Sequence, residues 1–312
     1  MRVMVTGGTG FVGSHIVVAL MAARHEVRLL VRRPEQVAMT FAAHGTSPDD
    51  LVVGDVRDEA VIRQALDGCD AVVHAAAVFS VDPRRAAEVT ATNVAATEAV
   101  LGCAVAARCD PVVHISSTIA LTRHGPSGPD LPLGDIDMPY AASKTESERV
   151  ARRLQETGAP VVTVYPGGVY GPYDPHLGDQ AARLVWVVRG RMPMWPAGGF
   201  HGVDVRDVAA TVVAALEPGR GPRRYVVPGH HVSGAEIFGA VERAIGPQTP
   251  PPHVAQGHRR PGDGPDRRCS GPSARLVALP GRSRGRRAHD PRHPPRRQSR
   301  SCRVRPAASR VG

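Results

Sequence analysis

The stretch VTGGTGFVGS, residues 5–14, decides the fold of this chain because it joins two elements of different kinds. The short β-branched segment RVMVTG (2–7) runs into it and predicts a strand. After it come HIVVALMAAR (15–24), whose apolar positions suit a helix, and a second short apolar run, EVRLLVR (26–32). The glycines therefore fall in a tight turn between a strand and a helix, where a residue without a side chain lets the backbone turn sharply.

The same alternation of short apolar strands and helices continues along the chain. Further strands are predicted at 50–55, 70–77, 111–117 and 160–166, and helices near 58–67, 86–107 and 140–157. Continuous apolar strands separated by helices indicate a parallel sheet covered on both faces. We therefore expect an α/β fold of the Rossmann type, a doubly wound parallel sheet whose ligands bind beyond the carboxyl ends of the strands.

Composition limits the class of protein. A chain of 312 residues with 42% hydrophobic residues can bury the core of one large domain or of two modest ones. Its net charge of +10 is local, because residues 247–312 contain 16 Arg and 3 Asp, which leaves −3 for residues 1–246. A mildly acidic body disfavours a specific nucleic-acid partner. We expect a small-molecule substrate instead, with a homodimer as the candidate assembly.

The five cysteines form no CxxC pair and no Cys/His ligand spacing, so neither a metal site nor a disulfide framework is predicted. Met1 leads directly into an apolar strand pattern without the layout of a signal peptide. No apolar run approaches the ~18 residues that a membrane-spanning helix needs. We therefore expect a soluble, cytoplasmic protein without a membrane span.

Gly7, Gly10 and Gly13 are the glycines of the first turn whose spacing suits a ligand. Glycines at the end of a strand permit close approach of the backbone, so that a pyrophosphate can rest on the N-terminal amides of the following helix. An ordinary strand-to-helix turn is the alternative interpretation. In this strand-first context the pattern predicts a dinucleotide site.

The ends of the second and third strands indicate which dinucleotide binds. Arg32 and Arg33 stand where NAD-binding chains usually have an acidic residue, and this favours NADP, with NAD as the alternative. A pair of solvated surface arginines is the other interpretation. Asp55, after the third strand, either accepts hydrogen bonds from the adenine amino group or caps the next helix.

Tyr140 and Lys144 are four residues apart in PYAASK (139–144), which on a helix puts both side chains on one face. A neighbouring ammonium group lowers the pKa of a phenol from about 10 and makes it a usable acid or base at neutral pH. Ser117, at the end of PVVHISS (111–117), would hydrogen-bond the same substrate oxygen. A Tyr-x-x-x-Lys pair alone is common on protein surfaces, but in order with the glycine loop it predicts a catalytic set.

The chain resembles the extended short-chain dehydrogenase/reductase family, of the NAD-dependent epimerase/dehydratase type, through TGGTGFVG, GDVRD, VVHAAA, HISS, YAASK and YPGGVYGP. The resemblance covers residues 1–246 and implies one domain, in which mainly 1–165 bind the cofactor and elements within 166–246 bind the substrate. It also implies that Ser117, Tyr140 and Lys144 are the catalytic residues. The cofactor-binding residues that we expect are Gly7, Thr9, Gly10, Phe11, Val12, Gly13, Arg32, Asp55, Val56, Ala75, Ala76, Tyr140, Lys144, Pro166 and Val169.

The motifs are most similar to those of dihydroflavonol reductase-like and 3β-hydroxysteroid dehydrogenase-like members. The acidic pair that sugar-nucleotide dehydratases carry after the catalytic hydroxyl is replaced by Thr118, Ile119 and Ala120, which disfavours dehydration. We expect an NADP-dependent oxidoreductase that interconverts a hydroxyl and a carbonyl group on a small hydrophobic substrate by hydride transfer. The alternatives are a sugar-nucleotide epimerase, disfavoured by Val31 and Arg32, and a protein that binds cofactor but is catalytically impaired.

Four polar residues lie outside these arguments. Tyr165 departs from the family pattern, since many members have Arg before the Pro of YPGGVYGP. Asn93 falls in the predicted 86–107 helix, where an Asn usually has a structural role. His230 and His231 are expected in a loop, facing solvent.

The substrate-binding segment is predicted to contain a return helix capped by Asp204 or Asp207, a strand at RRYVVPG (223–229) and a last helix. That last helix has Ser233 as its N-cap and Glu236 three residues on, the pattern of a capping box. Four apolar residues form either a substrate wall or core, with core favoured: Trp186, Met192, Met194 and Trp195.

Residues 247–312 contain 12 Pro and 16 Arg and no aromatic residue. Such a segment cannot bury enough apolar surface to offset its chain entropy, so we expect a disordered tail. The substrate-binding portion would then be incomplete, because the family places pocket-closing helices here. A reading-frame shift in a GC-rich gene, a genuine basic tail and an RNA- or membrane-binding appendage are the three interpretations. The last is disfavoured because aromatic interleaving is missing.

Overall fold

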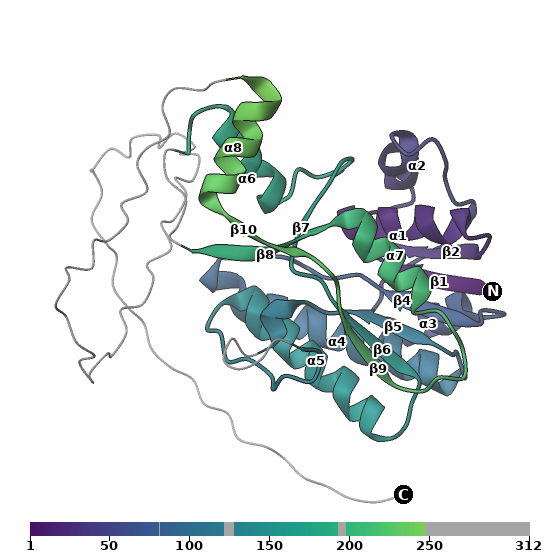
Figure 1. Cartoon of the computed structure of the whole chain (residues 1–312). Coiled ribbons are helices and arrows are strands. Elements are labelled where there is room, and N and C mark those ends of the chain that lie inside the picture. The colour runs from purple at the N-terminus through teal and green to yellow at the C-terminus, as the bar shows by residue number, and fades with distance from the viewer. Residues whose placement is uncertain (81, 122–127, 193–197, 247–312) are drawn as a thin grey trace, which may run out of the picture. The chain divides into compact units, whose positions relative to one another are not determined.

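Seven parallel strands form the main sheet, in the order β3-β2-β1-β4-β5-β6-β9 (Figure 1). They are β1 (Arg2–Thr6), β2 (Glu26–Val31), β3 (Asp50–Val53), β4 (Ala71–His74), β5 (Val112–Ile115), β6 (Val161–Tyr165) and β9 (Arg223–Val226). The structure is a computed structural model that describes residues 1–80, 82–121, 128–192 and 198–246. The strand order reverses between β1 and β4, and in open sheets of this kind the crevice at such a reversal is where ligands bind.

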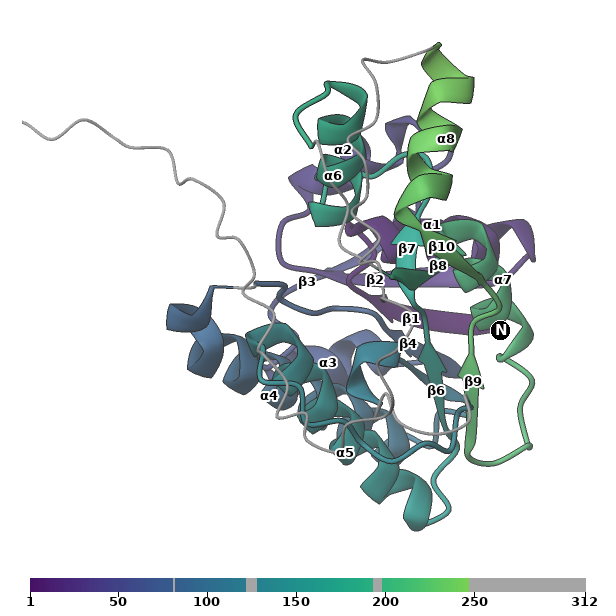
Figure 2. The same cartoon turned by 60° about the vertical axis from the view of Figure 1, so that its left-hand side comes forward.

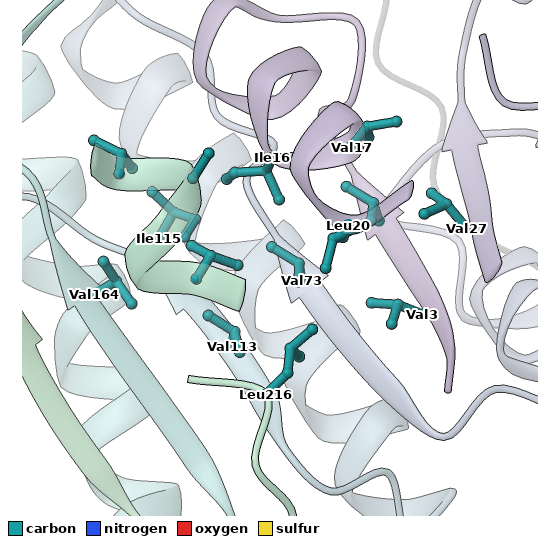
Figure 3. Packing of buried hydrophobic residues seen from close by; sticks show 14 of the residues in the cluster. Val3, Ile16, Val17, Leu20, Val27, Val73, Val113, Ile115, Val164 and Leu216 are labelled. Carbon is teal, nitrogen blue, oxygen red and sulfur yellow. The ribbon is translucent and has the colours of Figure 1, made fainter. Parts of the chain in front are cut away.

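Helices cover both faces of this sheet (Figures 1 and 2). On one face lie α1 (Phe11–Ala22), α2 (Glu35–Ala42) and α7 (Val205–Ala214), and on the other α3 (Glu59–Leu66), α4 (Ala86–Ala106) and α5 (Pro139–Glu156). Side chains alternate between the faces along each strand. Val3 of β1 therefore packs with α1 in one core (Figure 3). Val5 belongs to the same core, while Met4 packs with α3 and α4 in the other.

A second, three-stranded sheet carries the chain beyond β6. It consists of β7 (Gly168–Tyr170), β8 (Gly199–Asp204) and β10 (His230–Ser233), with β8 in the centre, parallel to β7 and antiparallel to β10. Two helices accompany it, α6 (Asp179–Val188) and α8 (Gly234–Ile245). They pack together through Val187 and Ile237, which form a small separate core.

Most of the predicted elements of the main sheet are confirmed within a residue or two. Asp204 is the N-cap of α7, and Ser233 and Glu236 make the predicted capping box at the start of α8. The prediction of a loop at His230 and His231 is wrong, because both residues lie in β10 and pair with β8, although both side chains are exposed. The expectations for 247–312, Met194 and Trp195 lie outside the described residues.

In the part of the chain that the structure describes, one helical stretch, Pro83–Ala106, is long and apolar enough to cross a membrane. This stretch contains α4, which packs against α5 and the sheet and buries eight of its residues, among them Val100 and Leu101. It is therefore a core helix of the α/β fold.

Candidate functional site

The glycine loop between β1 and α1 is packed so closely that side chains are excluded. Gly7 has a φ of +73°, and a Cβ atom there would lie 2.5 Å from the backbone nitrogen of Ala76. A Cβ atom on Gly13 would lie 2.0 Å from the carbonyl oxygen of Gly7. Gly10 is the N-cap of α1 and offers no side chain to cap the first amides. Without a side-chain cap from Gly10, the first amides of α1 at the carboxyl end of β1 suit a pyrophosphate, so the loop fits the expected dinucleotide.

The segment after β4 forms the other side of this crevice. The Ala75 amide donates to the carbonyl oxygen of Thr6 at 3.1 Å, and the Ala76 amide lies 3.4 Å from its hydroxyl. The backbone of β4 is thereby fixed beside the glycine loop. Thr9, Phe11 and Val12 complete the loop and the first turn of α1.

Arg32 and Asp55 follow the adjacent strands β2 and β3, as expected for the adenosine end of a cofactor. The Arg57 guanidinium donates two hydrogen bonds of 2.9 Å to the Asp55 carboxylate. These hydrogen bonds, with a smaller contribution from the charge of Arg32, lower the pKa of Asp55 to about 2. Asp55 does not cap the next helix, because Asp58 is the N-cap of α3. Val56 lies between Asp55 and Arg57 in the sequence. The sequence analysis did not identify Arg57 as part of this site.

Tyr140 and Lys144 lie in the first turns of α5, and the Lys144 side chain points to the end of β5. Its Nζ atom donates a 2.9 Å hydrogen bond to the carbonyl oxygen of Ile115 and lies 5.9 Å from the centroid of the Tyr140 ring. Lys144 is buried, with 6% of its surface exposed. The structure thus brings together the two residues that the sequence paired.

Ser117 lies two residues beyond Ile115 and joins the ends of β5 and β6. Its hydroxyl donates to the carbonyl oxygen of Pro166 at 3.4 Å, and the Thr118 amide donates to the same oxygen at 3.0 Å. The Ser117 side chain also accepts a hydrogen bond from Ile119, as the N-cap of the short helix η2 (Thr118–Ala120), which packs against α5. Ser117, Pro166 and α5 therefore converge, while Val169 pairs with the second sheet through β8.

Burial dominates the electrostatics of the pair. It raises the pKa of Tyr140 to about 12. It lowers the pKa of Lys144 to about 8, against the opposing effect of the Glu148 carboxylate. The expectation that the pKa of Tyr140 is lowered is therefore wrong for this structure, because burial disfavours the charged phenolate. At neutral pH the phenol is protonated and can act as a proton donor.

Two residues near Tyr140 were not among the expected site residues. Asn93 is buried and exchanges hydrogen bonds with the backbone of Val78, and its amide also donates to the Ser143 hydroxyl at 3.0 Å. It ties α4 to α5 next to Tyr140, which is the structural role that helical position suggested. The Phe79 ring lies 4.7 Å from the Tyr140 ring between centroids and is 49% exposed. No sequence signal marked Phe79.

An apolar cavity of about 400 Å³ opens beside the second sheet. Its apolar lining comes from α6, α8 and all three strands, and the residues are Tyr170, Leu184, Phe200, Val203, Val232 and Ile237. Trp186 does not line it, and Met192 packs against the small core of Val187 and Ile237, so these two residues are not part of the wall. A Cβ atom built on Gly168, two residues after Pro166, would lie 2.9 Å from the Phe200 ring, so this wall of the cavity lies beside the segment that follows β6.

Known proteins with this arrangement identify the family. The model of the NAD dependent epimerase/dehydratase family matches residues 3–227. The chain is 31% identical to the sterol demethylase protein B of Methylococcus capsulatus, over 82% of this chain and 80% of that protein. It is 30% identical to the 4-hydroxy-2-methyl-3-oxo-4-farnesyl-3,4-dihydroquinoline-1-oxide ketoreductase of Stigmatella aurantiaca, over 72% and 67%.

A solved structure agrees with these relatives. The dTDP-glucose 4,6-dehydratase of Streptomyces venezuelae, crystallised with NAD, is 31% identical and superposes with a TM-score of 0.67, over 80% of this chain and 82% of that chain. Sequence, fold and glycine loop therefore lead to one assignment. The chain belongs to the NAD dependent epimerase/dehydratase family and is an NAD(P)-binding oxidoreductase.

Proposed function

We propose that this protein is an NADP-dependent oxidoreductase that interconverts a hydroxyl and a carbonyl group on a small hydrophobic substrate. One observation carries the proposal: Lys144 is hydrogen-bonded to the end of β5, two residues from Ser117, on the helix that also holds Tyr140. Proton donor, cation and hydroxyl are thus close together beyond the carboxyl ends of the strands, in the half of the sheet next to the glycine loop.

The residues divide the chemistry of carbonyl reduction among them. The bound cofactor supplies the hydride to the carbonyl carbon. Tyr140, protonated at neutral pH, donates its proton to the oxygen that becomes the hydroxyl, and the Ser117 hydroxyl hydrogen-bonds the same oxygen and orients it. Lys144 would hold the nicotinamide ribose of the bound cofactor, and its positive charge lies beside the phenol, where a phenolate would develop. In the oxidative direction the same proton returns to Tyr140.

Support for NADP comes from the end of β2. Arg32 is exposed there, and its charge reaches Asp55 at the end of the neighbouring strand. A guanidinium is the group of choice for a phosphate, because its fork of N–H donors matches the phosphate oxygens. No carboxylate stands at the end of β2 to bind the free 2′-hydroxyl of NAD.

Support for a hydrophobic substrate comes from the cavity and from the relatives. Leu184, Phe200 and Ile237 give the cavity apolar walls next to Gly168. The two relatives described above are named for a sterol and for a farnesyl-bearing ketone. We infer that these walls contact the apolar body of the substrate while its carbonyl group faces Tyr140.

A sugar-nucleotide reaction is the second candidate, because the similar solved structure is a dTDP-glucose 4,6-dehydratase with bound NAD. Thr118, Ile119 and Ala120 argue against dehydration, since none supplies the acid or base for loss of water.

The test compares the two candidates directly. Purified protein is mixed with NADPH and a panel of sterol-like and isoprenoid ketones, and separately with NAD and dTDP- or UDP-hexoses. The proposal expects NADPH consumption with at least one hydrophobic ketone and no conversion of the sugar nucleotides. Conversion of a sugar nucleotide would instead favour the second candidate. NADPH binding without any turnover would identify a catalytically impaired chain.

A further inference from the structure

One helical turn after Lys144 on α5 lies a buried carboxylate that the proposed mechanism does not use. Glu148, on α5, has no exposed surface. Its Oε1 atom accepts a 2.6 Å hydrogen bond from the Tyr165 hydroxyl and a 3.3 Å hydrogen bond from Nε of Arg152. Its Oε2 atom has no hydrogen-bond partner of ordinary geometry among the described residues. Burying a carboxylate is costly unless its charge is paired and hydrogen-bonded. Burial raises the pKa of Glu148, and the Tyr165 and Ser116 hydroxyls and the charge of Arg152 oppose that rise.

Glu148 and Lys144 are four residues apart on one helix, so their side chains lie on the same face. Both are buried, and in a poorly solvated interior a charge one helical turn away is weakly screened. The Glu148 carboxylate accordingly raises the pKa of Lys144, in opposition to the larger effect of burial, which lowers it.

The other groups around this pair cannot replace Glu148 as a counter-ion. Lys144 faces Tyr140 on its own helix and the buried His74 of β4 and His114 of β5, none of which carries negative charge at neutral pH. Glu148 faces three groups, Tyr165 of β6, Arg152 of α5 and the Ser116 hydroxyl. One carboxylate therefore serves two cations, Lys144 and Arg152.

We propose that Glu148 is a positioning residue for Lys144: its buried carboxylate, held in place by the Tyr165 hydroxyl, keeps the ammonium group charged while that group is hydrogen-bonded to the end of β5. This role rests on the proposed function only because the proposed function gives Lys144 a part in the reaction. The charge coupling itself is a property of the protein without cofactor or substrate.

Tyr165 explains how the carboxylate keeps enough negative charge for this role. A cation at this position would be a third positive charge beside Lys144 and Arg152 and would compete with Lys144 for one carboxylate. A phenol donates a hydrogen bond that stabilises the carboxylate but adds no charge. Replacing Tyr165 by Phe removes this hydrogen bond together with the contact between the Tyr165 hydroxyl and Arg152, so the carboxylate protonates more readily and its effect on Lys144 weakens.

The test uses the fact that the chain contains a single lysine. Protein labelled with ¹³Cε-lysine gives one side-chain signal from Lys144, whose chemical shift reports its charge without assignment. The signal is followed from about pH 5 to about pH 10 in the wild type, in Glu148→Gln, in Tyr165→Phe and in Glu146→Gln. The last is the matched control, because Glu146 lies on the same helix but is paired at the surface with Arg149.

We expect the titration midpoint of Lys144 to fall by about one pH unit or more in Glu148→Gln, because loss of the anion leaves burial unopposed. Tyr165→Phe should lower it by a smaller amount, and Glu146→Gln should leave it unchanged. Circular dichroism identifies any variant that fails to fold. If Glu148→Gln does not fold, Tyr165→Phe still tests the proposal.

The proposal is overturned if folded Glu148→Gln, or folded Tyr165→Phe when the first variant does not fold, titrates with the wild-type midpoint. A fall of the same size in Glu146→Gln would also overturn it, because the effect would then be a general one of charge. Once a substrate is found, the high-pH limb of kcat should move to lower pH in the same order of variants. The titrations test the effect of Glu148 on Lys144 even if the protein reduces no ketone of the panel.

Discussion

The Nζ atom of Lys144 donates a hydrogen bond to the carbonyl oxygen of Ile115, the last residue of β5. A helix residue is thereby tied to a strand end. This hydrogen bond restricts the long lysine side chain, and the entropy of fixing it is lost during folding. Tyr140 lies one turn earlier on α5, with its ring centroid 5.9 Å from the same Nζ atom.

The first prediction concerns the proton donor. Tyr140→Phe removes one oxygen atom from the proton path and keeps the ring, including its contact with Phe79. We expect turnover to fall by about 10²- to 10⁴-fold while NADPH affinity changes little. Steady-state kinetics and fluorescence titration measure the two quantities, with Tyr225→Phe on β9 as the control. Turnover at the wild-type rate would remove Tyr140 from the proposed mechanism.

The residues that sequence reasoning identified are those whose chemistry is local. The glycine turn before α1 and the capping box of Ser233 and Glu236 are fixed by neighbours within a few residues, and the structure contains both. The Tyr140 and Lys144 pair depends only on helical spacing. A motif whose residues all lie in one helix or one turn can be predicted from the sequence before the fold is known.

The features that were missed depend on distant partners. β8 contains two glycines, which weaken strand propensity, and it exists because β7 and β10 pair with it. Asn93 meets Ser143 across 50 residues of sequence. The pKa of Tyr140 was misjudged for the same reason, since burial is a property of the whole fold.

The second prediction tests the cofactor preference. Arg32→Asp should weaken NADPH binding by about 10- to 100-fold, the value of a lost charge-assisted hydrogen bond, and should change NADH binding much less. Fluorescence titration with both cofactors measures the ratio. Arg24→Asp is the control, because Arg24 is exposed beyond the end of α1 and its positive φ suits Asp. Equal affinities of the wild type for NADPH and NADH would contradict the assignment to NADP.

The third prediction uses two glycines with opposite surroundings. Gly13→Ala would place a Cβ atom 2.0 Å from the carbonyl oxygen of Gly7, so the loop must move. We expect a loss of about 1–3 kcal/mol in unfolding free energy and a loss of cofactor binding. Gly102→Ala, within α4, meets no atom within 4 Å and should stabilise the protein by about 0.5–1 kcal/mol. Urea unfolding distinguishes the two, and a stable Gly13→Ala protein that binds NADPH normally would disprove the close-packed loop.

The last prediction concerns two histidines beneath the site. His74 and His114 stack with their ring centroids 5.7 Å apart, and both are almost fully buried. Burial lowers the pKa of His74 to about 3 and lowers the pKa of His114 strongly, with smaller contributions from Lys144. Both residues are therefore neutral in the folded protein, whereas in the unfolded chain each binds a proton near pH 6.5.

The sign of the pH dependence follows from this difference. Below about pH 6.5 the unfolded chain binds more protons than the folded protein, so stability is full above that pH and falls as the pH drops toward 3. For each buried neutral histidine, the free energy of unfolding should fall by about 1.4 kcal/mol when the pH is lowered from about 7.5 to about 5.5. Neither ring nitrogen of His114 has a hydrogen-bond partner among the described residues. His114→Leu should therefore leave the free energy of unfolding at about pH 7.5 unchanged or raise it. On going to about pH 5.5, the unfolding free energy of this variant should fall by about 1.4 kcal/mol less than that of the wild type. Urea unfolding at both pH values measures this difference, with His230→Leu, at an exposed position, as the control. If His114→Leu kept the pH dependence of the wild type, the His114 ring would take up a proton inside the folded protein.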